Sequence, residues 1–237
     1  MVDKQEQKKK SDGILSRIVA MREFNLFVII IAAGVVMAFT SEYFIRWTNL
    51  RVLISSMATD GIVVIGMTLI LIVGGIDLSV GSVMIFSMTV CALLFKAGMN
   101  PWIAALIAVF FSAGTGYIMG MLVTKLKLTH FIVTLAFMGI MRGLVLILST
   151  GTPVSIVAIL EGAPVFKALG QGQLFGKGTA FPTQLPIQVL IFLTITIFAD
   201  YMVRNSSAMR VVFYTGSNAK AAEYSGINTQ RTILTVG

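Results

Sequence analysis

The sequence predicts an all-α polytopic membrane protein, and three observations carry this prediction. Hydrophobic residues make up 57% of the 237 residues and charged residues only 12%, against roughly 45 to 50% apolar content in soluble domains. The mean hydropathy is +0.91. Uncharged runs long enough to cross a bilayer recur along the whole chain, and basic residues stand in short clusters between them. A water-soluble chain of this size cannot bury so much apolar surface.

Six segments meet or approach the length of a membrane span, which is about 20 apolar residues. They are residues 24–41, 52–74, 80–96, 102–123, 129–148 and 185–203. A seventh apolar segment begins near Thr232, and the sequence stops inside it at Gly237. We therefore expect six complete transmembrane helices and the start of a seventh.

The positions of the basic residues predict the orientation of these spans, because Lys and Arg concentrate in cytoplasmic loops. A cytoplasmic N-terminus places a basic segment, residues 1–23, on the same side as Lys125, Lys127, Arg204, Arg210, Lys220 and Arg231. Residues 24–237 then form the transmembrane domain, with an extracytoplasmic loop at 149–184 and a cytoplasmic loop at 204–231. Within the outer loop we expect one short helix around residues 163–169. The net charge of +8 is explained by topology, and no nucleic-acid partner is expected.

Several kinds of catalytic and cofactor site are excluded by composition. Cys91 is the single cysteine and His130 the single histidine, so neither a disulfide framework nor a cysteine-rich or two-histidine metal site is available. Residues 171–179, QGQLFGKGT, resemble a phosphate-binding loop, but Gln171 replaces its first glycine and Gly178 its magnesium-binding hydroxyl. We expect no metal, no cofactor and no ATPase site in this chain, and we assign no catalytic residues. An intramembrane enzyme would need a partner for His130, and none is evident.

The segment GGIDLSVGS, residues 74–82, interrupts an otherwise hydrophobic stretch with glycines, an acid and serines. A break at membrane depth needs a partner for every freed backbone group. Asp77 or Ser79 is placed to cap the following helix, where an acceptor or a negative charge is favoured. Direct contact of either side chain with a solute is the other interpretation, and both stay open here.

Asp60 and Arg142 are ionisable residues inside predicted spans, which makes them candidates for the solute pathway. Their distances from the outer ends of their helices are roughly 12 and 9 Å at 1.5 Å per residue. We hypothesise that they pair in the outer half of the pathway. Alternatively, each snorkels or is satisfied by backbone carbonyls.

The cytoplasmic stretch YTGSNAKAAEYSGIN, residues 214–228, predicts a short surface helix. Ser217 and Asn218 are capping residues, residues 219–223 are helix formers, and Gly226 is a stop signal. Such a helix either fits a groove on a partner protein and transmits movement or is a plain connector.

The motifs GGIDLSVGS and GSNAKAAEYSGIN together resemble the signatures of the membrane permease subunits of bacterial ribose-type and related simple-sugar ABC importers. HFIVTLAFMGIMRGL, residues 130–144, and FKALGQGQLFG, residues 166–176, followed by Pro186, are similar to further segments of that family. His130 stands where proline is common in the family. Four such segments in the same order cover most of the chain.

This resemblance implies a fold like that of cobalamin and iron-chelate importers and transport by alternating access in the bacterial inner membrane. It implies cytoplasmic ATP-binding subunits that carry ATP and magnesium, a periplasmic or lipid-anchored sugar-binding protein, and a second permease subunit. Residues 216–227 would then form the coupling helix, using Gly216, Asn218, Ala221, Ala222, Ser225 and Gly226. The candidates for the pathway remain the polar residues found within the spans, which are Asp60, Asp77, Ser79 and Arg142. Because family members usually continue with several more helices, we expect this chain to be C-terminally truncated.

The sequence leaves four questions open. An ion-gradient-driven secondary transporter is the alternative function, because broken helices and buried acids also occur in that class. Which sugar is carried, and whether the pore is a homodimer or a heterodimer, do not follow from the sequence. It also does not say whether the chain is a fragment or a functional truncated protein.

Overall fold

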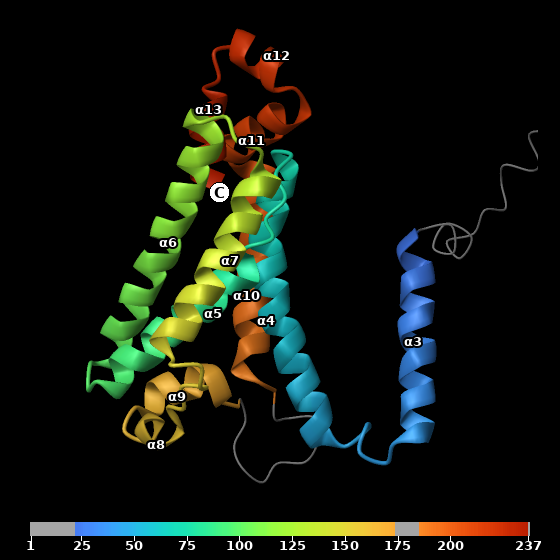
Figure 1. The fold of residues 1–237 in the computed structure, drawn as a ribbon. Helices are drawn as coiled ribbons and strands as arrows, with labels where there is room; N and C mark the ends of the chain where they lie inside the picture. The colour runs from blue at the N-terminus through green and yellow to red at the C-terminus, as the bar shows by residue number, and fades with distance from the viewer. Residues whose placement is uncertain (1–21, 174–184, 237) are drawn as a thin grey trace, which may run out of the picture. The chain divides into compact units, whose positions relative to one another are not determined.

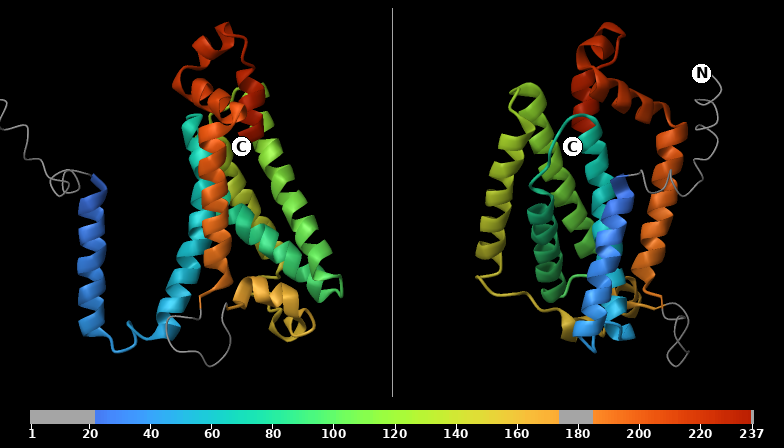
Figure 2. Two further views of the ribbon diagram at one scale, coloured as in Figure 1. Left: turned by 180° about the vertical axis from the view of Figure 1, so that it is seen from behind. Right: turned by 90° about the vertical axis from the view of Figure 1, so that its right-hand side faces the viewer.

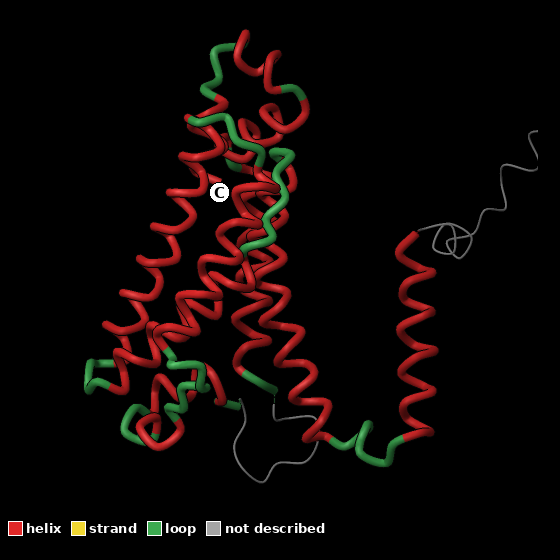
Figure 3. Tube along the Cα trace, in the orientation of Figure 1, coloured by secondary structure: helices red, strands yellow, loops and turns green. Residues whose placement is uncertain are grey.

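The computed structural model describes residues 22–173 and 185–236, and these residues fold as helices joined by short connections (Figures 1 and 3). Outside the helices, Gln173 and Pro186 form one isolated β-bridge. The helices are α3 (Arg22–Thr40), α4 (Trp47–Ile72), α5 (Val80–Lys96), α6 (Pro101–Lys125), α7 (His130–Leu148), α8 (Val157–Leu160), α9 (Pro164–Gln171), α10 (Ile187–Asn205), α11 (Ser207–Ser217), α12 (Ala219–Tyr224) and α13 (Thr229–Val236). The prediction of an all-helical protein is confirmed for this part of the chain.

The chain divides into two compact units, Met1–Leu53 and Ile54–Gly237. The described part of the first unit holds α3 and the first turns of α4. The α3 helix is apolar over nearly its whole length, from Phe24 to Thr40. All features discussed below lie in the second unit.

The helices coincide closely with the predicted spans. Four of them are long and apolar enough to cross a membrane, namely α4, α6, α7 and α10. The predicted spans 24–41 and 80–96 are also apolar helices, but their apolar lengths, Phe24–Thr40 and Val80–Lys96, are shorter. The chain is therefore a multi-pass helical membrane protein with four spans of full length among the described residues.

The packed core of the second unit is made by α5, α6 and α7, with α5 lying against both of the others. Small residues on α6 allow close approach, and Ala104 is fully buried. Phe86 of α5 meets Phe111 of α6 edge-on, with ring centroids 6.2 Å apart. Nearby, the hydroxyls of Ser87 and Ser112 hydrogen-bond to each other across the same interface. Because lipid is as apolar as these side chains, packing and interhelical hydrogen bonds hold the helices together.

One end of this unit gathers α11, α12 and α13 around the last turns of α4 and α6 and the start of α7 (Figures 1 and 2). The α13 helix packs on α6, where a methyl group on Gly120 would lie 3.1 Å from a side-chain carbon of Leu234. We call this the α12 end. The predicted surface helix around residues 219–223 is confirmed as α12, and α13 begins three residues before the predicted start at Thr232.

The opposite end carries α8 and α9, which precede the residues outside the described ranges. The helix predicted around residues 163–169 is confirmed as α9, and α8 is an additional turn. Phe166 of α9 packs against Phe95 of α5 and Trp102 of α6, with ring centroids 6.2 and 5.6 Å apart. Lys167 donates to Glu161 at 2.5 Å, and this hydrogen bond lowers the pKa of the Glu161 carboxyl group. The segment 171–179 resembles a phosphate-binding loop, and we expect no ATPase site there. Its residues 174–179 lie outside the described ranges.

The end of α4 gives a test of this architecture, because Gly74 has a φ of +83° and a methyl group added to it would meet no atom within 4 Å. Gly74→Ala should lower the free energy of unfolding by about 1 to 2 kcal/mol through backbone strain alone. Gly66→Ala, inside α4 and equally uncrowded, should instead raise it by about 0.5 to 1 kcal/mol. Unfolding in detergent micelles measures both, and shifts of the same sign in the two variants would contradict the left-handed turn at Gly74.

Candidate functional site

The candidate site is the non-helical segment between α4 and α5, residues 73–79, which we call the break. It starts with a Schellman motif, in which the Gly74 N–H donates to the Leu71 carbonyl at 3.0 Å and the Gly75 N–H to the Ile70 carbonyl at 2.9 Å. This motif needs a left-handed residue after the helix, and Gly74 supplies it at φ +83°. The chain then runs back from the α12 end toward the start of α5 (Figures 1 and 2). The break is therefore irregular backbone lying alongside membrane-spanning helices.

Asp77 and Ser79 hold the second half of the break through one carboxyl oxygen. Oδ1 of Asp77 accepts from the Ser79 N–H at 2.6 Å and from the Ser79 hydroxyl at 2.7 Å. Ser79 is fully buried, while Asp77 is half-buried. The single hydroxyl proton of Ser79 goes to the carboxyl oxygen rather than to Met119 Sδ, which lies 3.4 Å away, because the oxygen is closer and a stronger acceptor.

The helix-capping expectation needs a correction in detail. Ser79 occupies the N-cap position of α5, but its side chain makes no capping hydrogen bond to the helix. Its backbone is already helical, with φ −86° and ψ −19°, so its hydroxyl turns back to Asp77. Asp77 in turn binds the N–H of Ser79 itself, one residue before the helix begins. The pair therefore fixes the break rather than the first turn of α5.

Three side chains from α6 and α7 complete the support of the break. The Thr134 hydroxyl of α7 has carbonyl acceptors within reach on both sides. The carbonyl of Ile76 in the break lies 3.2 Å away, and that of His130 in the same helix lies 2.9 Å away. Gly75 is buried against His130, whose ring carbon Cδ2 would lie 3.0 Å from a methyl group there. Met119 of α6 covers Ser79. Both Met119 and Thr134 are buried, at 8% and 4% exposure.

Sequence analysis missed Met119 and Thr134 as supports of the break. Nothing in the sequence distinguishes one methionine among the 14 of this chain. Thr134 carried a weak signal, since it is a hydroxyl residue in an apolar helix, and such residues seek backbone carbonyls of their own or a neighbouring helix.

Asp60 and Arg142, the other two predicted pathway residues, lie on α4 and α7 and are both exposed. The structure does not bring them into an ion pair. Among the described residues, the ion pairs are Lys167 with Glu161 and Arg204 with Asp200. Spacing along two helices gives depth but not the facing of each side chain, which is why the pairing did not follow from the sequence. A role for these two residues in the pathway stays a prediction.

The short helix α12 is built as its sequence predicts. The Asn218 side chain accepts from the Ala221 N–H at 3.0 Å, which caps the start of the helix. Gly226, at φ +83°, ends it through a second Schellman motif, with the Ile227 N–H donating to the Ala222 carbonyl at 3.0 Å. The Glu223 side chain accepts from the buried Thr229 hydroxyl at 2.6 Å and ties α12 to α13.

A hollow of about 390 Å³ opens beside α12. Its lining residues are mostly small or polar, and they are Tyr214, Ser217, Asn218, Ala221, Ala222, Ser225 and Ile227. Four of the six residues predicted to contact a partner lie here, namely Asn218, Ala221, Ala222 and Ser225. Gly216 lies apart from the hollow and contacts α4, as described below, and Gly226 forms the turn after the helix.

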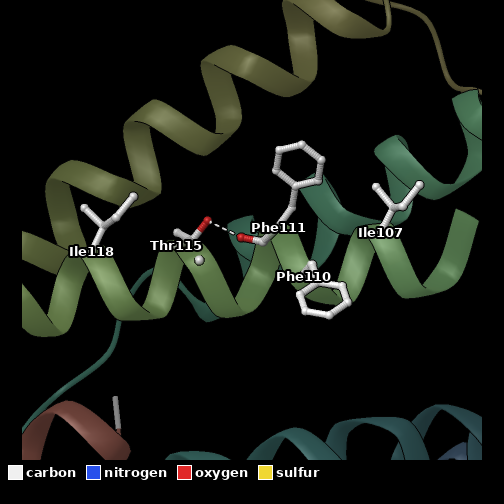
Figure 4. A pocket seen from close by; sticks show the side chains of 6 residues that line it. Ile107, Phe110, Phe111, Thr115 and Ile118 are labelled. Atoms are coloured by element: carbon white, nitrogen blue, oxygen red, sulfur yellow. Dashed lines mark hydrogen bonds between the residues drawn. The ribbon is translucent and has the colours of Figure 1, made fainter.

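A second hollow, of about 330 Å³, lies on α6 and differs in character (Figure 4). Ile107, Phe110, Phe111 and Ile118 form its walls together with Gly114 and Thr115. The Thr115 hydroxyl is already used, since it donates to the Phe111 carbonyl at 2.8 Å. A groove with apolar walls and a satisfied hydroxyl suits lipid or another helix better than a polar solute. Within the described ranges, no three His, Cys, Asp or Glu side chains cluster as metal ligands.

Comparison with known proteins identifies the family. Residues 48–236 match the family described as the permease component of the branched-chain amino acid transport system. The chain belongs to this family. The matched range contains the break, the α5–α6–α7 core and α12, so the whole candidate site lies within the family domain. The resemblance to permeases of simple-sugar importers, inferred from the motifs, is confirmed by the relatives.

The relatives include several sugar import permeases. The ribose import permease protein RbsC of Escherichia coli strain K12 is 29% identical over 211 residues, which are 89% of this chain and 63% of that protein. RbsC of Bacillus subtilis strain 168 is 30% identical over 95% of this chain and 65% of that protein. The D-allose transport system permease protein AlsC of E. coli K12 is 28% identical over 90% of this chain and 61% of its own length. The chain thus spans less than two thirds of these relatives, and no solved structure matches it.

Asp77 offers a test of the break that separates hydrogen bonding from charge. Asp77→Ala removes the acceptor for the buried Ser79 N–H and should lower the free energy of unfolding by about 1 to 3 kcal/mol. Asp77→Asn keeps a side-chain oxygen at the same place and should retain most of that stability. Denaturation of the two variants in micelles is the measurement. If Asn destabilises as much as Ala, the negative charge rather than the acceptor supports the break.

Proposed function

We propose that this chain is the transmembrane permease subunit of an ATP-driven ABC importer for a simple sugar. The observation that carries the proposal is the family match across residues 48–236, together with relatives named as ribose, fructose and allose permeases. The family description names branched-chain amino acids, but these relatives are sugar permeases. A pentose, a hexose or a related small polar solute is therefore the proposed substrate class.

The proposed topology has the N-terminus and the α12 end on the cytoplasmic side of the bacterial inner membrane. The basic residues support it, because Lys125 and Lys127 fall at the end of α6 and just after it, and Arg204, Arg210, Lys220 and Arg231 fall between the end of α10 and α13. Cytoplasmic loops are enriched in such residues. The proposal also has six membrane spans, with α13 as the start of a seventh. The proposed fold is like that of cobalamin and iron-chelate importers.

In this proposal α12 docks on a cytoplasmic ATP-binding subunit. The helix is exposed and firmly capped at both ends, and the hollow beside it offers small residues against which a partner side chain can pack. Tyr224 is 91% exposed and adds an aromatic contact next to it. ATP and magnesium are bound by that partner, while this chain supplies no covalent chemistry. A periplasmic or lipid-anchored sugar-binding protein and a second permease subunit complete the importer.

The proposed transport mechanism is alternating access around the break. Asp77 and Ser79 provide polar groups beside the pathway, and Asp60 and Arg142 are further candidates on the exposed faces of α4 and α7. Extended backbone at membrane depth is tolerated only where it is buried in protein or lines a water-filled cavity. Gly75 and Ser79 of the break are buried against α7 and α6, while Ile76 and Leu78 are exposed. The break gives α4 and α5 a joint about which they can reorient.

An ion-gradient-driven secondary transporter is the second candidate, favoured by a carboxyl group placed at a broken helix. The ATP-driven importer and the secondary transporter can be distinguished by the energy source that uptake requires. Uptake of labelled pentoses and hexoses into membrane vesicles should require ATP and persist when the ion gradients are collapsed. Uptake that ignores ATP and stops with the gradient would overturn the ABC assignment.

A substitution in the hollow beside α12 tests the docking proposal. Ala221→Trp fills the hollow and should reduce co-purification of the ATP-binding subunit by about tenfold or more, without changing the unfolding midpoint of the chain. Lys220→Trp is the matched control, because Lys220 lies on the same helix but does not line the hollow. Equal retention of the ATPase by the two variants and the unsubstituted protein would exclude this surface as the docking site.

A further inference from the structure

Gly216, near the end of α11, lies directly against the last carbonyl of α4. A methyl group on Gly216 would overlap the Ile72 carbonyl oxygen, and it would lie 2.8 Å from the carbonyl carbon and 3.3 Å from the Val73 Cα. Every one of these atoms is backbone. Backbone atoms cannot rotate away as a flexible side chain can, so only the absence of a Cβ at position 216 permits this contact.

Among the last four carbonyls of α4, that of Ile72 is the one that accepts no backbone hydrogen bond from the described residues. The carbonyls of Leu69, Ile70 and Leu71 accept from Val73, Gly75 and Gly74. No N–H or O–H within the described ranges donates to Ile72. The Gly216 α-hydrogen that stands where a Cβ would be faces this oxygen.

The remainder of the interface between α4 and α11 is loose. Ile72, Met209 and Phe213 line one apolar hollow of about 410 Å³, which reaches along α4 and α10. Across a hollow of this size the side chains of α4 and α11 are not in contact, so a movement of one helix is poorly transmitted to the other. The Gly216–Ile72 contact is therefore the close, stiff point between the helix that leads into α12 and the helix that leads into the break.

We propose that Gly216 is a positioning residue that sets the conformation of the break from the α12 end. Two residues along the chain from Ile72 stands Gly74, the left-handed turn of the break, and Asp77 and Ser79 follow within the same short segment. A displacement of α11 and α12 pushes on the Ile72 carbonyl and shifts the backbone that carries these two side chains. The inference rests on the proposed function for its purpose, but the physical linkage is a property of this chain alone.

Hydrogen exchange of the purified chain in nanodiscs tests the linkage. Gly216→Ala should accelerate amide exchange at residues 73–79 by roughly tenfold, although alanine is the better helix former at position 216. Gly66→Ala on α4 and Gly139→Ala on α7, where a methyl group meets no atom within 4 Å, should leave residues 73–79 unchanged. Unchanged exchange in Gly216→Ala, or acceleration spread equally over the α5–α6 core, would overturn the proposal.

A second variant keeps the test valid if Gly216→Ala does not fold. Linkage is reciprocal, so Asp77→Ala, which loosens the break, should also accelerate exchange in the last turn of α11, residues 214–217. Acceleration confined to the break would contradict the linkage. Neither measurement involves an ATPase, whereas failure to capture an ATPase on α12 would count against the proposed function only.

Discussion

The structure depends on one constraint, which is that backbone N–H and C=O groups away from water must find partners inside the protein. The break between α4 and α5 is where this constraint is hardest to meet. Its first N–H groups return to α4 through the turn at Gly74, Ser79 is served by Asp77, and Thr134 reaches the Ile76 carbonyl. These requirements bring the break against α6 and α7, and they explain why these two helices contribute buried side chains beside it.

Much of this fold follows from the sequence because hydrophobicity and turn chemistry are local. Apolar runs predicted the spans to within a few residues, and Asn218 and Gly226 marked the ends of α12 because capping acts over three or four residues. The shorter apolar lengths of α3 and α5 could not be separated from full spans by hydropathy alone. Contacts between distant segments were out of reach. Neither the absence of an Asp60–Arg142 ion pair nor the support from Met119 and Thr134 can be read from spacing along single helices.

The two motifs that most resemble sugar permeases are remote in sequence yet adjacent in space. The first forms the break, and the second begins at Gly216 and continues through α12. Gly216, which opens the second motif, contacts the backbone of Ile72 and Val73, directly before the first motif, and a single methyl group would prevent this contact. This gives a physical reason for finding both motifs in one chain, since a surface that receives movement has value only if something rigid links it to the segment that moves.

The aromatic contacts at the far end of the core lie at the end of α5 opposite Ser79, so they move when α5 tilts. Phe166 packs against Phe95 and Trp102, and these contacts connect the tip of α5 and the start of α6 to the α9 helix. Ser79 lies at the opposite end of α5, directly before its first residue, and is taken as the fixed point. A rod of 17 residues is about 25 Å long, and a tilt of only about 5° around this point would therefore swing the far end by about 2 Å. A small tilt of α5 about Ser79 therefore becomes a larger displacement of the aromatic residues at its other end.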